Sequence, residues 1–280
     1  MEYLKRGLSK TVDSIKKHKG LFLALVLLQV IFVVSSLWLG SQYLIKILED
    51  TQGIIGPLEN ANYDSQKIEQ GQPFTPDYAA IYNSYQSMLK NVLVFAAWIA
   101  ALFLILNGSI WLLSHWMLQE QKQWKLRMKE GAQFLVKAWA SAFLLLGPFT
   151  IISYFILLHF IRVSQSFSDI ALVLKSLLVA LWIAYYFFLA ALAAAPIRSW
   201  KRFAAIWIRI SVKEFRKTTV LFVSIMAALL ASFAALYAAV EYTESVVLLL
   251  PLGLLCMLML NATRLFWIAS IQEIENMPTT

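Results

Sequence analysis

The chain has 280 residues and a formal net charge of +8, with 60% hydrophobic and only 14% charged residues. A soluble domain carries about 25% charged residues, so this composition excludes an ordinary water-soluble protein and favours a chain embedded in lipid. The single cysteine, Cys256, lies in an apolar run, which excludes a disulfide framework and a thiolate metal cluster.

Residues 1–19 are basic and have an amphipathic pattern. Six cations lie in this segment, on faces other than that of a helical apolar stripe. The stripe consists of Leu4, Leu8, Val12 and Ile15. We predict a cytoplasmic amphipathic helix that lies on the membrane surface.

The apolar run 20–44 follows directly, and a basic segment before an apolar run is also typical of a signal peptide. This run is longer than a usual signal-peptide core, and no cleavage pattern follows it. About 20 apolar residues suffice to cross the hydrocarbon core of a bilayer, so we predict the first transmembrane helix here.

Residues 45–90 are predicted to form an outer loop, because their centre is rich in Gly, Pro, Asn and Gln. The sequence Thr75-Pro76-Asp77 is typical of a helix start, so the second span, 91–115, is expected to project outward. A loop of this size predicts a small cap rather than an independent domain.

An inner linker, 116–134, with a weak amphipathic pattern precedes the third and fourth spans. These spans are predicted at 135–160 and 172–195, and Lys137 and Lys175 lie near their ends, where a long side chain can reach the headgroups. Gly147-Pro148 predicts a kink or a broken turn in the third span.

The segment 196–218 contains PIRSWKRFAAIWIRISVKEFRK, in which apolar residues recur every three or four positions between cations. We predict an amphipathic helix in the headgroup plane of the inner leaflet. Its lipid-interface residues are Arg198, Trp200, Lys201, Arg202, Trp207, Arg209, Lys213, Arg216 and Lys217. The alternative is an ordinary basic linker with no dedicated lipid- or partner-binding role.

The last two spans are predicted at 219–240 and 246–268, followed by a cytoplasmic tail, 269–280. Pro251 predicts a kink in the sixth span, and Arg264 near its inner end is expected to reach the headgroups. Alanines recur every fourth residue in the fifth span, which predicts close packing against the small-residue run that ends the fourth. These alanines are Ala227, Ala231, Ala235 and Ala239.

The distribution of positive charge predicts the orientation. Of the 24 Lys and Arg residues, 19 fall on the side that holds both termini and the linkers 116–134 and 196–218. Cytoplasmic segments carry the excess of such residues, so we expect a multi-pass protein of the cell membrane with both termini in the cytoplasm.

The predicted fold is all-α, with six transmembrane helices and a basic amphipathic segment before each odd-numbered span. Whether these form three repeated modules stays open.

Residues that carry chemistry are sparse in the predicted spans, which contain no Asp or Glu. His18 and His115 lie near one surface and His159 near the other, which excludes a three-histidine metal site. We therefore predict no catalytic residue, no metal and no cofactor. Four polar residues either line a polar path or make interhelical hydrogen bonds. They are Gln29, Asn107, Ser109 and Asn261.

The stretch AALAAAPIRSWKRFAAIWIRISVKEFRKTTVLF, in which a basic amphipathic helix joins two spans, resembles the linker of a group of prokaryotic multi-helix membrane proteins. This group includes Yip-like proteins and the membrane domain attached to some glycerophosphoryl diester phosphodiesterases. The resemblance implies a multi-helix membrane domain. The catalytic phosphodiesterase barrel is absent from the sequence, so the resemblance implies no such activity.

From these features we expect a non-enzymatic integral membrane scaffold or accessory subunit, whose cationic cytoplasmic face contacts anionic lipid and partners. The expected partners are lipids of the inner leaflet and another protein or a second copy of this chain. We expect no nucleic-acid partner, because the cations are combined with an apolar stripe that suits a bilayer. The alternative is an uncoupled small-molecule transporter or channel-like protein.

Overall fold

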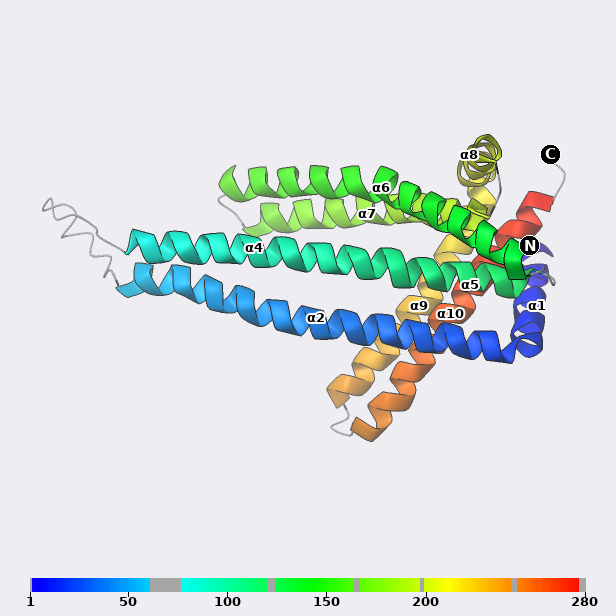
Figure 1. Ribbon diagram of the computed structural model, residues 1–280, viewed down its shortest axis with the longest axis horizontal. Helices are drawn as coiled ribbons and strands as arrows, with labels where there is room; N and C mark the ends of the chain where they lie inside the picture. The colour runs from blue at the N-terminus through cyan, green and yellow to red at the C-terminus, as the bar shows by residue number, and fades with distance from the viewer. Residues whose placement is uncertain are drawn as a thin grey trace, which may run out of the picture. The chain divides into compact units, whose positions relative to one another are not determined.

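The computed structural model describes residues 2–60, 77–119, 124–163, 167–196, 199–242 and 246–276, and all regular structure within them is helical (Figure 1). The predicted all-α class is therefore confirmed. The elements are α1 (Glu2–Lys17), α2 (Lys19–Asn60), α4 (Tyr78–Leu102), the π-helical segment η1 (Phe103–Asn107), α5 (Gly108–Leu118), α6 (Trp124–Val163), α7 (Phe167–Ala194), α8 (Trp200–Ile208), the π-helical segment η2 (Arg209–Lys213), α9 (Phe215–Tyr242) and α10 (Val246–Asn276).

Six helical stretches in the described part of the chain are long and apolar enough to cross a membrane. Each overlaps one of the six predicted spans. They are Lys19–Leu58, Tyr78–Leu118, Glu130–Ile156, Ala171–Ala194, Phe215–Tyr242 and Leu249–Asn276.

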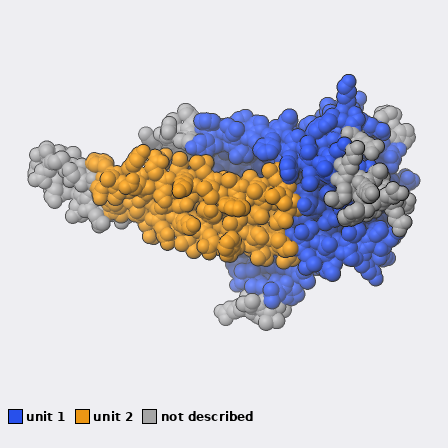
Figure 2. All heavy atoms as spheres, in the orientation of Figure 1, with its two compact units in different colours: residues 1–29, 108–280 blue, residues 30–107 orange. Residues whose placement is uncertain are grey.

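The chain divides into two compact units (Figure 2). Unit 1 contains residues 1–29 and 108–280, and unit 2 contains residues 30–107. Unit 1 therefore holds both ends of the chain together with helices α5 to α10.

Unit 2 is an antiparallel helical pair formed by α2 and α4. Asn91 Nδ2 donates to Asp50 Oδ2 at 2.7 Å, and the rings of Tyr43 and Phe95 lie 5.6 Å apart between centroids. No residue of α4 is fully buried, because each helix has only one neighbour in this unit.

The predicted loop segment 45–90 is helical at its first end, where the prediction is wrong because α2 continues to Asn60; residues 61–76 lie outside the described part. Gly53, which suggested a loop, lies inside α2 and against α4. A Cβ atom at Gly53 would lie 2.4 Å from Ser84 Oγ, so this glycine allows a close helix contact. The predicted helix start is confirmed, because Asp77 is the N-cap and its side chain accepts a hydrogen bond from Ala80 N.

Unit 1 is organised around two helical pairs, α6 with α7 and α9 with α10, and α1 packs on α10 and α5 (Figure 1). Its core contains large side chains that are almost completely inaccessible. They include Leu25, Ile110, Phe134, Leu192, Leu221, Leu265 and Trp267.

The small-residue end of α7 packs differently from the prediction. Residues 190–195 are buried, whereas Ala227, Ala231 and Ala235 of α9 are exposed, so the predicted alanine contact between these two spans is wrong. The end of α7 instead accommodates large side chains. Trp267 Nε1 donates to Leu189 O at 3.1 Å, and His115 Nε2 lies 3.0 Å from Leu192 O.

The three segments predicted to lie on the inner surface agree with the structure to different degrees. α1 agrees with the predicted helix over 1–19, but 196–218 is divided into α8, η2 and the first turn of α9. α6 already begins at Trp124 and continues into the third span, so 116–134 is not a separate surface helix. The predicted tail, 269–280, is helical up to Asn276. A short separate helix thus precedes the first and fifth of the six long apolar helices but not the third.

Pro148 and Pro251 lie inside helices that continue past them. Neither proline divides its helix, so broken turns at these positions are not observed. The interruptions in the described helices are instead the π-helical segments η1 and η2, which the sequence analysis did not predict.

Candidate functional site

Helix α1 packs on the rest of unit 1 through a face of small and polar residues. The buried residues of α1 are Tyr3, Gly7, Thr11 and Ser14. Ser14 Oγ donates a 2.7 Å hydrogen bond to Met117 O in α5, and Tyr3 Oη donates one of 3.2 Å to Lys217 O in α9. Burial raises the pKa of the Tyr3 hydroxyl, and the nearby Lys217 ammonium acts in the opposite direction.

Gly7 explains how α1 comes so close to α10. A Cβ atom at Gly7 would lie 2.2 Å from Ser270 Oγ and 3.1 Å from Ser270 Cα. Ser270 is completely buried, so a larger residue at position 7 would force its side chain or one of the two helices to shift. The glycine therefore fixes the distance between α1 and α10.

The apolar stripe predicted for α1 lies away from this packed face. Leu8 is 56% exposed and Val12 is 40% exposed, while Leu4 and Ile15 are half-buried. The cations Lys5, Arg6, Lys16 and Lys17 are also exposed. α1 thus buries its small polar face and leaves Leu8, Val12 and most of its cations exposed.

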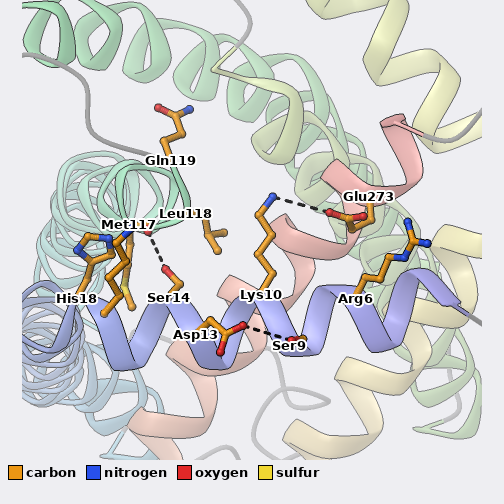
Figure 3. Close-up of a pocket in the computed structure, with 11 residues that line it drawn as sticks. Arg6, Ser9, Lys10, Asp13, Ser14, His18, Met117, Leu118, Gln119 and Glu273 are labelled. Atoms are coloured by element: carbon orange, nitrogen blue, oxygen red, sulfur yellow. Dashed lines mark hydrogen bonds and ion pairs between the residues drawn. The ribbon is translucent and has the colours of Figure 1, made fainter.

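A cavity of about 490 Å³ lies between α1, the end of α5 and the end of α10 (Figure 3). Its lining includes Arg6, Lys10 and Lys17 together with the carboxylates Asp13 and Glu273. Lys10 of α1 reaches α10, where its Nζ donates to Gln272 Oε1 at 2.9 Å and lies 3.9 Å from Glu273 Oε1. The cavity wall is therefore of mixed charge with a small positive excess.

The predicted lipid-interface residues of α8, η2 and α9 fall into two groups, and Arg198 lies outside the described residues. The exposed group is Trp200, Lys201, Arg202, Lys213 and Arg216, and the partly exposed group is Trp207, Arg209 and Lys217. Lys217 Nζ forms an ion pair with Glu214 Oε2 at 2.8 Å. Most of the predicted cations are therefore accessible for a partner.

The apolar face of α8 and η2, predicted to lie toward lipid, is divided between protein and surroundings. Phe203 and Ser211 are buried, and Trp207 Nε1 donates to Phe187 O of α7 at 3.0 Å. Trp200 and Ile208 remain exposed. The prediction is wrong for the buried half, because unit 1 supplies a packing partner that the sequence pattern does not reveal.

Lys137 of α6 lies beneath α8. Its side chain is 2% exposed, so it does not reach the headgroups as predicted. Its Nζ lies 5.7 Å from the ring centroid of Trp200 and 5.8 Å from that of Phe203. Such distances are typical of cation–π interactions, which link α8 to α6.

Arg264 of α10 forms a polar cluster with Gln29 and Asn261, which were both predicted as polar-path or hydrogen-bonding residues. Its guanidinium donates to Gln29 Oε1 and to Asn261 Oδ1, each at 3.1 Å, and lies 5.4 Å from the ring centroid of Trp111. Gln29 and Asn261 are buried. Arg264 therefore points into the helix bundle, and the prediction that it reaches the headgroups is wrong.

The other two predicted polar residues lie elsewhere. Asn107 is the last residue of η1 in unit 2, and Ser109 lies in the first turn of α5 in unit 1. The structure thus assembles Gln29 and Asn261 around Arg264, and does not assemble the four residues into one path within a unit.

The sequence pattern did not indicate that the side chains of Arg264 and Lys137 lie inside the helix bundle. One signal was present for Arg264, because Asn261 lies three residues before it, a spacing at which helical side chains meet. No sequence signal places Gln29 beside Arg264, since 235 residues separate them. For Lys137, the aromatic partners come from α8, which is also distant in the sequence.

Among the described residues, no group of three His, Cys, Asp or Glu side chains is placed to hold a metal ion. The site is therefore described by its cations, its exposed apolar side chains and the Arg264 cluster. No protein-family model, curated protein sequence or solved structure matches this chain.

Proposed function

We propose that the protein is a non-enzymatic integral membrane scaffold or accessory subunit, whose cationic cytoplasmic face contacts anionic lipid and protein partners. It would reside in the cell membrane with both termini in the cytoplasm, as the distribution of Lys and Arg indicates. The resemblance to prokaryotic multi-helix membrane proteins agrees with this proposal.

The observation that carries the proposal is the orientation of α1. A surface helix of a soluble protein buries its apolar stripe, but α1 buries Gly7, Thr11 and Ser14 and leaves Leu8 and Val12 accessible. An apolar stripe flanked by cations suits the boundary between acyl chains and headgroups. Tyr3 and Ser14 meanwhile hold α1 on the rest of unit 1.

The apolar helices and α8 support the same interpretation. Large apolar side chains on the six long helices are extensively exposed, for example Leu37, Phe143 and Leu250. Such exposure suits lipid and is unfavourable in water. On α8 and η2, Trp200, Ile208 and Val212 are exposed next to the cations, as in α1.

The lipid contact can be tested with the full-length protein in nanodiscs that contain phosphatidylcholine and phosphatidylglycerol. Each cation near an anionic leaflet contributes about 1 kcal/mol, so neutralising three of them should lower the preference for phosphatidylglycerol by about tenfold or more. The lipids that remain bound are counted by native mass spectrometry. The variant carries Lys5→Gln, Lys16→Gln and Lys17→Gln, which are all exposed positions of α1.

A matched control neutralises three exposed lysines on the predicted outer side. It carries Lys46→Gln, Lys90→Gln and Lys175→Gln. This variant should keep the preference of the natural protein for phosphatidylglycerol. Equal losses in both variants would show that only the net charge matters, and an unchanged preference in both would contradict the proposed lipid contact.

The proposed orientation has its own test. Residue 205 of α8 is exposed, and Cys256 is buried, so Ala205→Cys introduces an accessible thiol over a low background. A membrane-impermeant maleimide should label this cysteine in inside-out vesicles but not in intact cells, while Tyr82→Cys should show the reverse. Labelling of position 205 from outside intact cells would contradict the orientation.

A further inference from the structure

The guanidinium of Arg264 is contacted by neutral groups in the described part of the chain. Its partners are the amide oxygens of Gln29 and Asn261 and the indole ring of Trp111. The ion pairs made by Glu2, Glu273 and Glu214 lie elsewhere in the protein. A guanidinium in an apolar helix bundle is costly without an opposite charge, so a positive potential remains at this position.

A cavity of about 60 Å³ lies directly beside this guanidinium, between α5, α7, α9 and α10. Its walls are mainly apolar and include Trp111, Ile225 and Trp267. The polar side chains in the lining are those of Arg264, Thr263 and Tyr185, and none of the residues that line it is acidic. Apolar walls lower the effective dielectric constant, which strengthens the attraction of Arg264 for an anion.

The size of the cavity restricts its occupant. One water molecule takes about 30 Å³ in the liquid, so the space inside the cavity holds one small group, such as a halide ion or a carboxylate group. The cavity also has an accessible edge, because Tyr185 is 38% exposed. An anionic group can therefore reach Arg264 from the surface of unit 1.

We infer that this cavity binds one small monovalent anionic group, a halide or a carboxylate, with Arg264 as its counter-charge. Gln29 and Asn261 hold the guanidinium in place, Trp111 covers it, and the hydroxyl of Tyr185 is a second donor for the anion. The group is either a free ion or the carboxylate end of a fatty acid. This site goes beyond the proposed function, since it lies apart from the cations of α1 and α8.

The experiment uses the full-length protein in a detergent with a neutral headgroup, starting in the sodium salt of 2-(N-morpholino)ethanesulfonate, whose bulky anion carries no carboxylate. This anion is replaced at constant ionic strength by bromide or by acetate, and the unfolding temperature is recorded. A second arm adds dodecanoate, with dodecanol as the control that has the chain but no charge. We expect a saturable rise of the unfolding temperature with one of these anions.

Variants separate this site from general salt effects. Arg264→Gln should weaken the apparent affinity for the stabilising anion by about tenfold or more, whereas Arg264→Lys, which keeps the charge, should lose less. The control Arg216→Gln removes an exposed cation and should respond like the natural protein. If Arg264→Gln does not fold, Leu229→Phe fills the cavity from α9 without removing the charge, and should also abolish the response.

Each outcome has a defined meaning. Stabilisation by bromide or acetate supports a free ion, and stabilisation by dodecanoate but not by dodecanol, bromide or acetate supports a fatty acid. The absence of a saturable response to every anion would overturn the inference, as would an unchanged response in both Arg264→Gln and Leu229→Phe. Arg264→Gln should leave the preference for phosphatidylglycerol unchanged, so this inference and the proposed function can fail separately.

Discussion

Helices α1 and α8 have similar sequences in one respect, since both are short, basic and amphipathic, yet they pack on unit 1 through different kinds of faces. α1 is held by a face that contains Gly7 and Ser14, while Leu8 and Val12 of its apolar stripe stay exposed. α8 is held by aromatic side chains, because Phe203 is buried and Trp207 bonds to α7.

The difference shows that amphipathicity alone does not determine which face of a surface helix meets the protein. Small residues on α1 permit a close approach to α10, and Ser14 of α1 donates a hydrogen bond directly to Met117 O of α5. Aromatic residues on α8 instead lie against the buried ammonium of Lys137. Close contact fixes α1, whereas ring packing and cation–π interactions fix α8.

The largest effect is expected from Gly7→Ala, which places a methyl group where Ser270 already lies. Overpacking of this kind costs about 1–3 kcal/mol, so α1 should separate from α10 more often. Limited proteolysis of the detergent-solubilised protein should cut α1 faster, and the unfolding temperature should fall.

The double variant Gly7→Ala with Ser270→Gly tests the cause, because it removes the side chain that the new methyl group meets. It should recover most of the lost stability. Gly20→Ala is the matched control, since a Cβ atom at Gly20 has no neighbour within 4 Å, and it should not destabilise the protein. A failure of Ser270→Gly to rescue would contradict the close contact between α1 and α10.

The packing of α8 is tested by a double-mutant cycle on Lys137 and Trp200. Lys137→Met keeps the length of the side chain without its charge, and Trp200→Leu removes the ring. The coupling energy between these two changes should be about 0.5–2 kcal/mol, because a cation–π contact joins them. A cycle on Lys175 and Trp200 serves as the control, and a coupling near zero for Lys137 would contradict the interaction.

A smaller effect is expected from Trp207→Phe, which keeps an aromatic ring but removes the donor to Phe187 O. A hydrogen bond of this kind contributes about 1 kcal/mol. Hydrogen exchange of the amides of α8 should accelerate while that of α1 stays unchanged. Equal acceleration in both helices would show that they are not held independently.

The smallest effect at neutral pH is expected from Tyr3→Phe, which removes the 3.2 Å hydrogen bond to Lys217 O. Because burial raises the pKa of Tyr3, its neutral form stabilises the packed state below the ordinary pKa of about 10, and this contribution is lost as pH rises through the raised value. Proteolysis of α1 should therefore accelerate above about pH 10 in the natural protein and depend less on pH in Tyr3→Phe.

The six apolar helices and the boundaries of α1 were predictable from sequence, because they depend on local composition and periodicity. The N-cap at Asp77 was predictable for the same reason. The continuation of α2 to Asn60 was not, since Gly53 is a loop signal locally and becomes a packing position only when Ser84 is beside it. Likewise, the buried half of α8 depends on α6 and α7, which lie elsewhere in the sequence.

Local sequence is enough to show that this chain is helical and apolar and that its cations are clustered, because hydropathy and charge are properties of individual residues. Which face of α1 and α8 is covered, and which polar residues meet, depends on contacts between helices that are distant in the sequence. In the folded chain, Arg264 contacts Gln29 and a cavity lies beside the guanidinium. No local sequence pattern contains this contact between distant helices.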